Sequence, residues 1–187
     1  QTPFVYCLRP TAGDLDMIAG FTESIERCNG VDIAVHRAGG GRPLLLLHGY
    51  PQNHMCWERV APELALTHDV IIPDLRGYGG SSAPPNDSNN TTYSKRSMAQ
   101  DMADLLTVLQ IPHADVLGHD RGARVSYRFA LDHPERVGKL GIIEIVPTGD
   151  FWANWNADLA MAAYHWTFLA QPAPMPERMI SSDPEAY

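Results

Sequence analysis

The stretch that decides the fold is Val116–Gly122, with the sequence VLGHDRG. A short apolar run ends in a small-x-Asp-x-small pattern and a helical pattern follows at once, which is the form of a nucleophile elbow: strand, sharp turn, helix. The turn strains the backbone of its central residue, Asp120. Side chains at the flanking positions, Gly118 and Gly122, would collide with their surroundings in so tight a turn. The pattern predicts that Asp120 stands at the top of a sheet. Its carboxylate is ionised at neutral pH and needs no base to attack carbon.

The composition of the chain limits the classes of protein to which it can belong. The 187 residues carry a formal net charge of −8, with 44% hydrophobic and 19% charged residues, which fits one globular domain with a full core. The acidic balance argues against nucleic acid and an anionic membrane surface as partners. No apolar stretch could span a bilayer and no signal peptide is visible. Cys7, Cys28 and Cys56 fit no metal pattern, so we expect reduced thiols in a cytoplasmic protein.

Apolar runs and turn residues predict the order of the elements. Asn29-Gly30 indicates a two-residue hairpin turn, and continuous apolar runs predict strands covered on both faces, as in a parallel sheet. Ser97 and Gln100 are expected to form a capping box at the start of a helix. The expected strands are 21–27, 31–37, 43–47, 70–72, 115–118 and 137–146, and the expected helical segments are 57–64, 98–109 and 121–132.

The alternation of strands and helices predicts an α/β fold: a mostly parallel sheet with right-handed crossovers and helices on both faces. Residues 1–20 show no clear period and are expected to form an N-terminal arm. Residues 21–149 would form the core. Over 150–187 the composition becomes rich in aromatic residues, Ala and Pro, without a further strand, which indicates a second region.

Four segments carry a family resemblance: HGYPQN at 48–53, DLRGYGGSS at 74–82, GHDRGAR at 118–124 and HWTFLAQPAP at 165–174. Together they resemble the haloacetate (fluoroacetate) dehalogenases of the α/β-hydrolase superfamily. The resemblance implies an α/β-hydrolase fold, incomplete here, followed by the start of a helical cap domain. Related haloalkane dehalogenases and epoxide hydrolases carry Trp directly after the nucleophile, where this chain has Arg121.

The resemblance also implies a reaction, the hydrolysis of a haloacetate to glycolate and halide through an ester on the nucleophile. A substrate carboxylate about 4 Å from that nucleophile would be repelled by roughly 4 kcal/mol at an effective dielectric near 20, so fork-shaped guanidinium groups are needed to offset the repulsion. The family's roles fall on Asp120 as nucleophile, Arg121 and Arg124 as carboxylate ligands, the backbone N–H groups of Tyr50 and Arg121 as oxyanion hole, and His165 and Trp166 as halide site.

The second half of the reaction needs a base and an acid behind it. Glu144 interrupts the apolar run 142–146, where a carboxylate is expected to be buried and costly unless paired. The resemblance makes Glu144 the acid that orients the catalytic His, at a position where fluoroacetate dehalogenases usually have Asp; Asp74 is the less favoured acid. None of the eight histidines stands where the family has its base, and His119 is expected to point away from Asp120. We therefore expect the base in a C-terminal part beyond residue 187.

Two other functions stay open. An epoxide hydrolase would use the same Asp120 attack with tyrosine donors from the cap, although Arg121, Arg124 and the His165-Trp166 pair weigh against it. A non-catalytic binding domain, or an inactive fragment, is possible on the same fold because fold alone does not give function. We expect no cofactor or metal, a small haloacid as ligand, and a homodimer, the last only because the family suggests it.

Overall fold

The structure, a computed structural model, describes residues 17–184. Residues 1–16 of the predicted N-terminal arm lie outside the described residues. Ile18 is buried, and its carbonyl accepts a hydrogen bond from the Phe21 N–H at 3.0 Å. The chain divides into two compact units, the first ending at Ile145 and the second beginning at Val146. The change in composition near residue 150 therefore follows shortly after a structural division.

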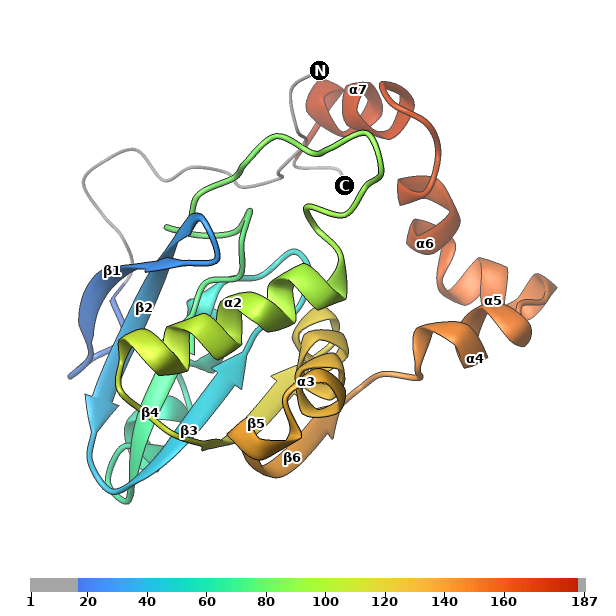
Figure 1. The fold of residues 1–187 in the computed structure, drawn as a ribbon. Helices are drawn as coiled ribbons and strands as arrows, with labels where there is room; N and C mark the ends of the chain where they lie inside the picture. The colour runs from blue at the N-terminus through green and yellow to red at the C-terminus, as the bar shows by residue number, and fades with distance from the viewer. Residues whose placement is uncertain (1–16, 185–187) are drawn as a thin grey trace. The chain divides into compact units, whose positions relative to one another are not determined.

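One sheet organises the first unit. Its strands are β1 (Thr22–Cys28), β2 (Val31–Gly39), β3 (Arg42–Leu47), β4 (His68–Pro73), β5 (Ala114–His119) and β6 (Val137–Ile143). The strand order is β1-β2-β4-β3-β5-β6 (Figure 1). β3 pairs in parallel with β4 and β5, and β5 with β6, while β2 is antiparallel to β1 and β4. This order confirms the predicted α/β class with a mostly parallel sheet.

The predicted hairpin is confirmed between β1 and β2. Asn29 and Gly30 have φ values of 46° and 77°, so both turn residues occupy the left-handed region that a two-residue hairpin turn requires. The register pairs Cys28 with Val31 and Thr22 with Arg37. Every strand expected from the apolar runs is present, within a few residues of its predicted ends.

The helices agree less well with the sequence patterns. In the first unit they are η1 (His54–Trp57), α1 (Ala61–Leu64), α2 (Lys95–Val108), α3 (Arg121–Asp132) and η2 (Pro134–Arg136). The helix expected over 57–64 is two short pieces, because Pro62 lacks an N–H and fits only at the start of a helix. The capping box at Ser97 is wrong: Ser94 caps α2 by accepting a hydrogen bond from the Ser97 N–H at 3.1 Å.

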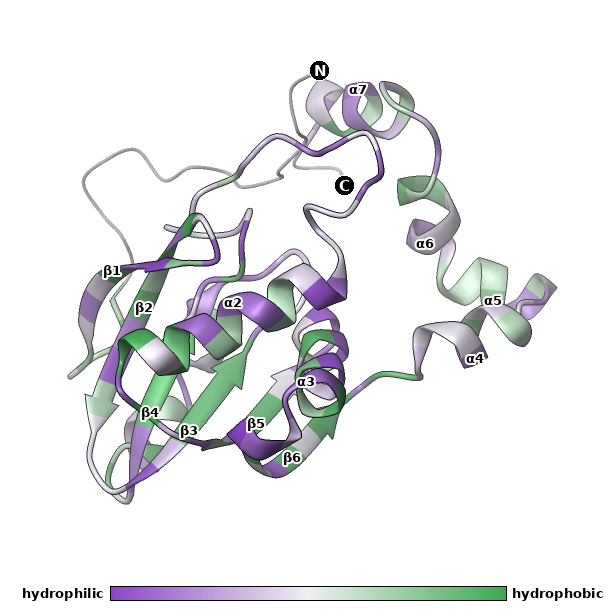
Figure 2. Cartoon of the chain, viewed as in Figure 1, coloured by the Kyte–Doolittle hydropathy of each residue, from purple (hydrophilic) through white to green (hydrophobic). Residues whose placement is uncertain are grey.

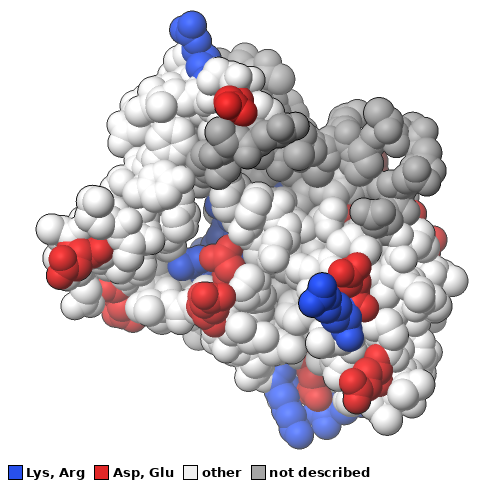
Figure 3. All heavy atoms as spheres, turned by 180° about the vertical axis from the view of Figure 1, so that it is seen from behind, with Lys and Arg blue, Asp and Glu red and all other residues white. Residues whose placement is uncertain are grey.

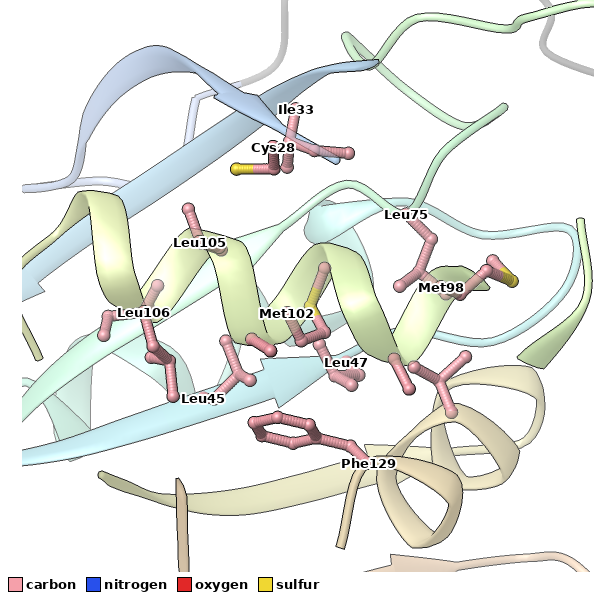
Figure 4. Packing of buried hydrophobic residues seen from close by; sticks show 14 of the residues in the cluster. Cys28, Ile33, Leu45, Leu47, Leu75, Met98, Met102, Leu105, Leu106 and Phe129 are labelled. Atoms are coloured by element: carbon pink, nitrogen blue, oxygen red, sulfur yellow. The ribbon is translucent and has the colours of Figure 1, made fainter. Parts of the chain in front are cut away.

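The two faces of the sheet carry separate hydrophobic clusters. Along β3, Leu45 and Leu47 belong to the cluster that α2 and α3 cover, whereas Leu46 belongs to the cluster that contains Trp57 of η1. Figure 4 shows Leu45 and Leu47 beside Phe129 of α3 and the buried side chains of α2. β3 and β4 are hydrophobic along most of their length (Figure 2), as strands covered on both faces must be. Helices on both faces are therefore confirmed.

The last strand is shorter than predicted. β6 ends at Ile143 instead of continuing to Val146. Glu144 has a φ of 58°, a left-handed conformation that cannot continue an extended strand. The apolar run therefore spans a strand and the turn that follows it, which periodicity cannot distinguish.

The second unit consists of short helices. They are α4 (Thr148–Ala153), α5 (Ala157–Ala162), α6 (Tyr164–Leu169) and α7 (Met175–Ser182). Aromatic rings pack together within this unit: the centroids of Phe151 and Trp166 are 4.0 Å apart, and those of Trp152 and Trp155 are 4.9 Å apart. The aromatic side chains of the segment thus form a partly exposed cluster within this unit, and its assignment as the start of a helical cap stays a prediction.

Acidic and basic side chains lie in small, mixed groups over the described part of the face drawn in Figure 3. Among residues 17–184, no helix combines the length and the apolar character needed to cross a membrane. Cys28 and Cys56 form no disulfide, and Cys7 lies outside the described residues. The cytoplasmic location and the homodimer stay predictions.

Candidate active site

The elbow has the geometry that its sequence predicts. Asp120 has a φ of 47° and a ψ of −112° between the end of β5 and the start of α3. A side chain on Gly118 would meet Ser126 and the backbone of α3, and one on Gly122 would meet the Leu47 and His48 carbonyls. Strain of this kind persists only where the surrounding structure fixes it, and it collects at functional sites. The elbow therefore holds the Asp120 side chain in one place.

Two backbone N–H groups bond the Asp120 carboxylate. The Tyr50 N–H donates to Oδ1 at 2.9 Å, and the Arg121 N–H at the start of α3 also bonds the carboxylate. Burial acts to raise the pKa of Asp120, but these hydrogen bonds and the charges of Arg124 and Arg121 outweigh it, so the pKa lies below its usual value. Asp120 is ionised at neutral pH, and the predicted oxyanion donors point at it.

The two arginines that are predicted to bind the substrate carboxylate, Arg121 and Arg124, differ in how the structure holds them. Arg124 Nη1 lies 3.1 Å from Asp120 Oδ2, and its side chain is 11% exposed. The Arg121 guanidinium lies 5.2 Å from the ring centroid of Tyr50 and 5.9 Å from that of Tyr78. Stacking on aromatic rings holds the plane of a guanidinium while its N–H donors stay at the edge. The structure thus brings Asp120, Tyr50, Arg121 and Arg124 together, as the sequence predicts.

The loop that carries Tyr50 is fixed at both ends to one segment after β4. At one end, His48 Nε2 accepts a hydrogen bond from the Leu75 N–H at 3.0 Å. His48 Nδ1 therefore carries the proton and donates to the Gly49 carbonyl at 2.9 Å. Burial lowers the pKa of His48, which agrees with this neutral tautomer. These two hydrogen bonds give His48 a structural role.

At the other end, His54 bonds Asp74. The His54 N–H donates to Asp74 Oδ1 at 2.7 Å, and His54 Nδ1 lies 3.0 Å from the same oxygen, while the Gly80 N–H donates to Oδ2 at 2.8 Å. Asp74 is fully buried. Burial acts to raise its pKa, but the interactions with His54, His48 and Gly80 outweigh burial and lower it. From the sequence, Asp74 is the less favoured candidate for the acid that orients the base; the structure shows a buried carboxylate that anchors the loop of Tyr50.

His36, His54 and Asp74 offer the donor set nearest to a metal site among the described residues. One donor atom from each lies within 4.8 Å of the others, and all three side chains are buried. The rings of His36 and His54 are stacked, however, with centroids 3.5 Å apart and planes 20° apart. Nitrogen lone pairs lie in the ring planes, so stacked rings direct them along nearly parallel planes that one ion cannot share. The trio is a packed polar cluster instead of a metal centre.

Lys95 is a feature that the sequence patterns do not reveal. It is the first residue of α2, and its Nζ lies 3.7 Å from Met98 Sδ. Burial and the charges of Arg121 and Arg124 lower its pKa from 10.5 to about 7, while Asp120 acts to raise it. A third cationic group thus acts on the surroundings of the nucleophile, and its protonation changes near neutral pH.

Glu144 is not buried, contrary to the expectation from the apolar run. Its side chain is 80% exposed, and its Oε2 lies 3.1 Å from His119 Nε2. β6 is the edge strand of the described sheet, with Leu140, Ile142 and Ile143 exposed beside Glu144, so no neighbouring strand covers it. The role of Glu144 as an acid that orients a base stays a prediction.

The predicted halide ligands lie in the second unit. His165 and Trp166 are adjacent on α6, and both are partly buried. The Trp166 ring packs 4.0 Å from Phe151 and 5.6 Å from Trp152, and His165 lies edge-on to Tyr164 at 6.0 Å. These contacts show a packing role for Trp166 within its own unit; halide binding by the pair stays a prediction.

Comparison with known proteins adds an independent finding. A family described as alpha/beta hydrolase fold matches residues 42–174. The chain is 43% identical over 171 residues to a fluoroacetate dehalogenase from Burkholderia sp, covering 91% of this chain and 56% of that protein. It is 41% identical over 163 residues to a soluble epoxide hydrolase from Corynebacterium sp. (strain C12), covering 85% and 54%.

A solved structure agrees with this similarity. The crystal structure of the Nostoc sp PCC 7120 protein ALR0039 matches with a TM-score of 0.89 and 46% identity, covering 91% of this chain and 59% of that one. The chain therefore spans a little more than half the length of each of these relatives.

We expect Asp74→Asn to lower the free energy of unfolding by about 1–3 kcal/mol, because an amide group in place of one buried oxygen leaves a donor facing a donor. Asp32→Asn is the matched control, since the Asp32 side chain is 51% exposed and pairs with Arg27 on the surface, and it should cost less than about 1 kcal/mol. Denaturant unfolding of both variants measures the difference. Equal losses would show that Asp74 does not anchor the loop.

His36 should make stability depend on acid. It is 1% exposed, neither ring nitrogen has a hydrogen-bond partner among the described residues, and burial followed by the charge of His54 lowers its pKa from 6.5 to about 4 while Asp74 acts to raise it. Between these values the unfolded chain binds more protons than the folded one, so stability falls as pH falls, by up to about 3 kcal/mol.

The variant His36→Leu removes this dependence. We expect its stability to match or exceed that of the unmodified protein at about pH 5, where His36 destabilises the unmodified protein, and to differ less at about pH 7.5, where His36 is neutral in both the folded and the unfolded chain. His113→Gln, at an exposed position, is the control. Thermal unfolding across this pH range is the measurement, and an unchanged acid sensitivity of His36→Leu would contradict the assignment.

Proposed function

Because the chain belongs to the alpha/beta hydrolase fold family, we propose that Asp120 is the nucleophile of a hydrolytic dehalogenase that acts on haloacetates. The observation that carries the proposal is the ionised Asp120 carboxylate at a strained elbow, bonded by the Tyr50 and Arg121 N–H groups and by Arg124. The similarity to a fluoroacetate dehalogenase supports the substrate class.

In the proposed first step, an Asp120 oxygen attacks the carbon that bears the halogen. The C–O bond forms as the C–halogen bond breaks, and the halide leaves with the bonding electron pair. This gives an ester of Asp120 and needs no proton transfer. His165 and Trp166 are the proposed halide ligands, since imidazole and indole N–H groups can donate to the departing ion.

In the proposed second step, water attacks the carbonyl carbon of the Asp120 ester. A general base removes the proton of the water, and the Tyr50 and Arg121 N–H groups stabilise the negative charge on the tetrahedral intermediate. Cleavage of the bond to the substrate oxygen releases glycolate, whose hydroxyl takes this proton from the base. Asp120 is left as the acid and returns to its carboxylate by releasing the second proton of the water to solvent, in keeping with its lowered pKa. The proposed base is a histidine supplied by sequence beyond residue 187, with Glu144 as the acid that orients it.

Arg121 and Arg124 would bind the substrate carboxylate. Both belong to the first turn of α3, where the N-terminal end of the helix also favours negative charge. Arg124 already donates to Asp120 Oδ2 at 3.1 Å, so an arriving carboxylate would compete with the nucleophile for this donor. An anionic substrate fits a site in which cationic groups outnumber the one carboxylate.

An epoxide hydrolase is the second candidate, because a relative of that name shares 41% identity with the chain. It would use the same attack by Asp120 on carbon. An epoxide has no carboxylate, however, and would give Arg121 and Arg124 no substrate charge to bind. Substrate charge therefore separates the two functions.

The decisive test compares acid and neutral substrates in the complete polypeptide that contains residues 1–187. We expect halide release from fluoroacetate and chloroacetate, and far less from their amides. Arg124→Ala should raise KM roughly 10- to 100-fold with a smaller loss of kcat, the effect of one charge-assisted hydrogen bond. Arg128→Ala, one turn further along α3 and paired with Asp132, is the control. Equal turnover of acid and amide, or hydrolysis of an epoxide alone, would overturn the proposal.

Substrate binding should also depend on pH through Lys95. A bound carboxylate would add a negative charge near Lys95 and raise its pKa from about 7, so binding takes up a proton and weakens as pH rises above 7. We expect KM for chloroacetate to increase between about pH 7 and 9, and Lys95→Met to flatten this dependence. Lys139→Met is a natural control, because Lys139 is exposed and is the only other lysine of the chain. An unchanged dependence of KM on pH in Lys95→Met would exclude a coupling between substrate binding and the protonation of Lys95.

A further inference from the structure

His119 and Glu144 lie at the ends of two adjacent parallel strands. The register pairs His119 with Ile143, and the Asp120 N–H donates to the Ile143 carbonyl at 3.2 Å. Asp120 and Glu144 therefore follow paired positions, each with a left-handed φ, of 47° and 58°. Two acidic residues with strained backbone conformations at the ends of neighbouring strands are a combination typical of functional sites.

The His119 ring contacts Glu144. Its Nε2 lies 3.1 Å from Glu144 Oε2, and because a carboxylate oxygen at neutral pH only accepts, Nε2 must carry the proton. On its other side the ring lies against Gly49: a Cβ there would be 3.0 Å from His119 Nδ1 and 2.7 Å from Asp120 Cβ. The ring thus lies between Gly49 and Glu144, and its proton points at Glu144.

Glu144 needs such a partner if it is to act in one orientation. Its side chain has several rotatable bonds and is 80% exposed, whereas the His119 side chain has fewer rotatable bonds and is only 26% exposed. An exposed pair of this kind adds little to stability, since surface ion pairs contribute about 0–1 kcal/mol. The contact can still select one rotamer of Glu144, so it orients the carboxylate even though it adds little to the free energy of unfolding.

We propose that His119 is a positioning residue that holds Glu144 through Oε2, so that its other oxygen is presented to the imidazole of the general base. The inference rests on the proposed function, because it concerns the base of the second step. It predicts a defect confined to ester hydrolysis, since the attack of Asp120 on substrate uses neither His119 nor Glu144.

The experiment separates the two steps in the complete polypeptide. Rapid quenching with chloroacetate gives the halide burst, and mass spectrometry of the Asp120 peptide gives the formation and decay of the ester. For His119→Leu we expect a burst rate within about twofold of the unmodified protein and ester decay slower by roughly 10- to 100-fold, as for other groups that orient a reacting side chain. His119→Gln keeps an N–H donor and should recover most of the rate.

Two further readouts distinguish positioning from a general packing role. Without the oriented carboxylate, the base is less able to hold a proton, so the acidic limb of the decay rate should move to lower pH in His119→Leu. Glu144→Asp shortens the side chain beyond the reach of Nε2, so adding His119→Leu to Glu144→Asp should slow decay by less than about threefold. Thermal unfolding of each variant checks that the fold is retained.

The outcomes separate the two claims. No halide from the unmodified protein would overturn the proposed function and this inference together. Halide release with unchanged ester decay in His119→Leu would overturn the inference alone. Equal losses in burst and decay, or a partial loss of decay that His119→Gln does not rescue, would assign His119 a structural role, whereas complete loss of decay with an intact burst in both His119 variants would make His119 the base itself.

Discussion

The hydrogen bond from the Tyr50 N–H to Asp120 Oδ1 is the interaction on which the site depends. A single backbone donor can hold a carboxylate only if its own loop is rigid. Here the loop is tied at both ends to one segment after β4, through His48 to Leu75 and through His54 to Asp74. The parallel sheet places β3, β4 and β5 side by side, so three strand ends, not one motif, define the position of the nucleophile.

Much of the fold around the nucleophile could be predicted from the sequence, because it depends on local patterns of residues. The elbow follows from Gly118 and Gly122, whose missing side chains the packing requires, and the hairpin follows from the φ preferences of Asn29 and Gly30. The apolar runs identify strands because both faces of the sheet are covered. These signals need only a few neighbouring residues, and the structure agrees with them.

The rest depends on contacts that neighbouring residues do not encode. His54 and Asp74 are separated by 20 positions, and nothing around either residue indicates the other. The low pKa of Lys95 comes from burial and from Arg121 and Arg124 on another helix. Glu144 was expected to be buried because it interrupts an apolar run, but burial depends on a neighbouring strand, and β6 is the edge of the described sheet.

The charges around Asp120 also bear on which substrate it could attack. Hydrogen bonds and cations that lower the pKa of a carboxylate make it a weaker nucleophile as well. A neutral epoxide would leave Arg124 on Asp120 Oδ2 and meet the nucleophile in this weakened state. A substrate carboxylate would compete for the same guanidinium, withdraw it from Asp120 and so restore the nucleophile at the moment of binding. On this argument the proposed preference for an anionic substrate reflects reactivity as well as affinity, because the group that recognises the substrate is the group that restrains the attack.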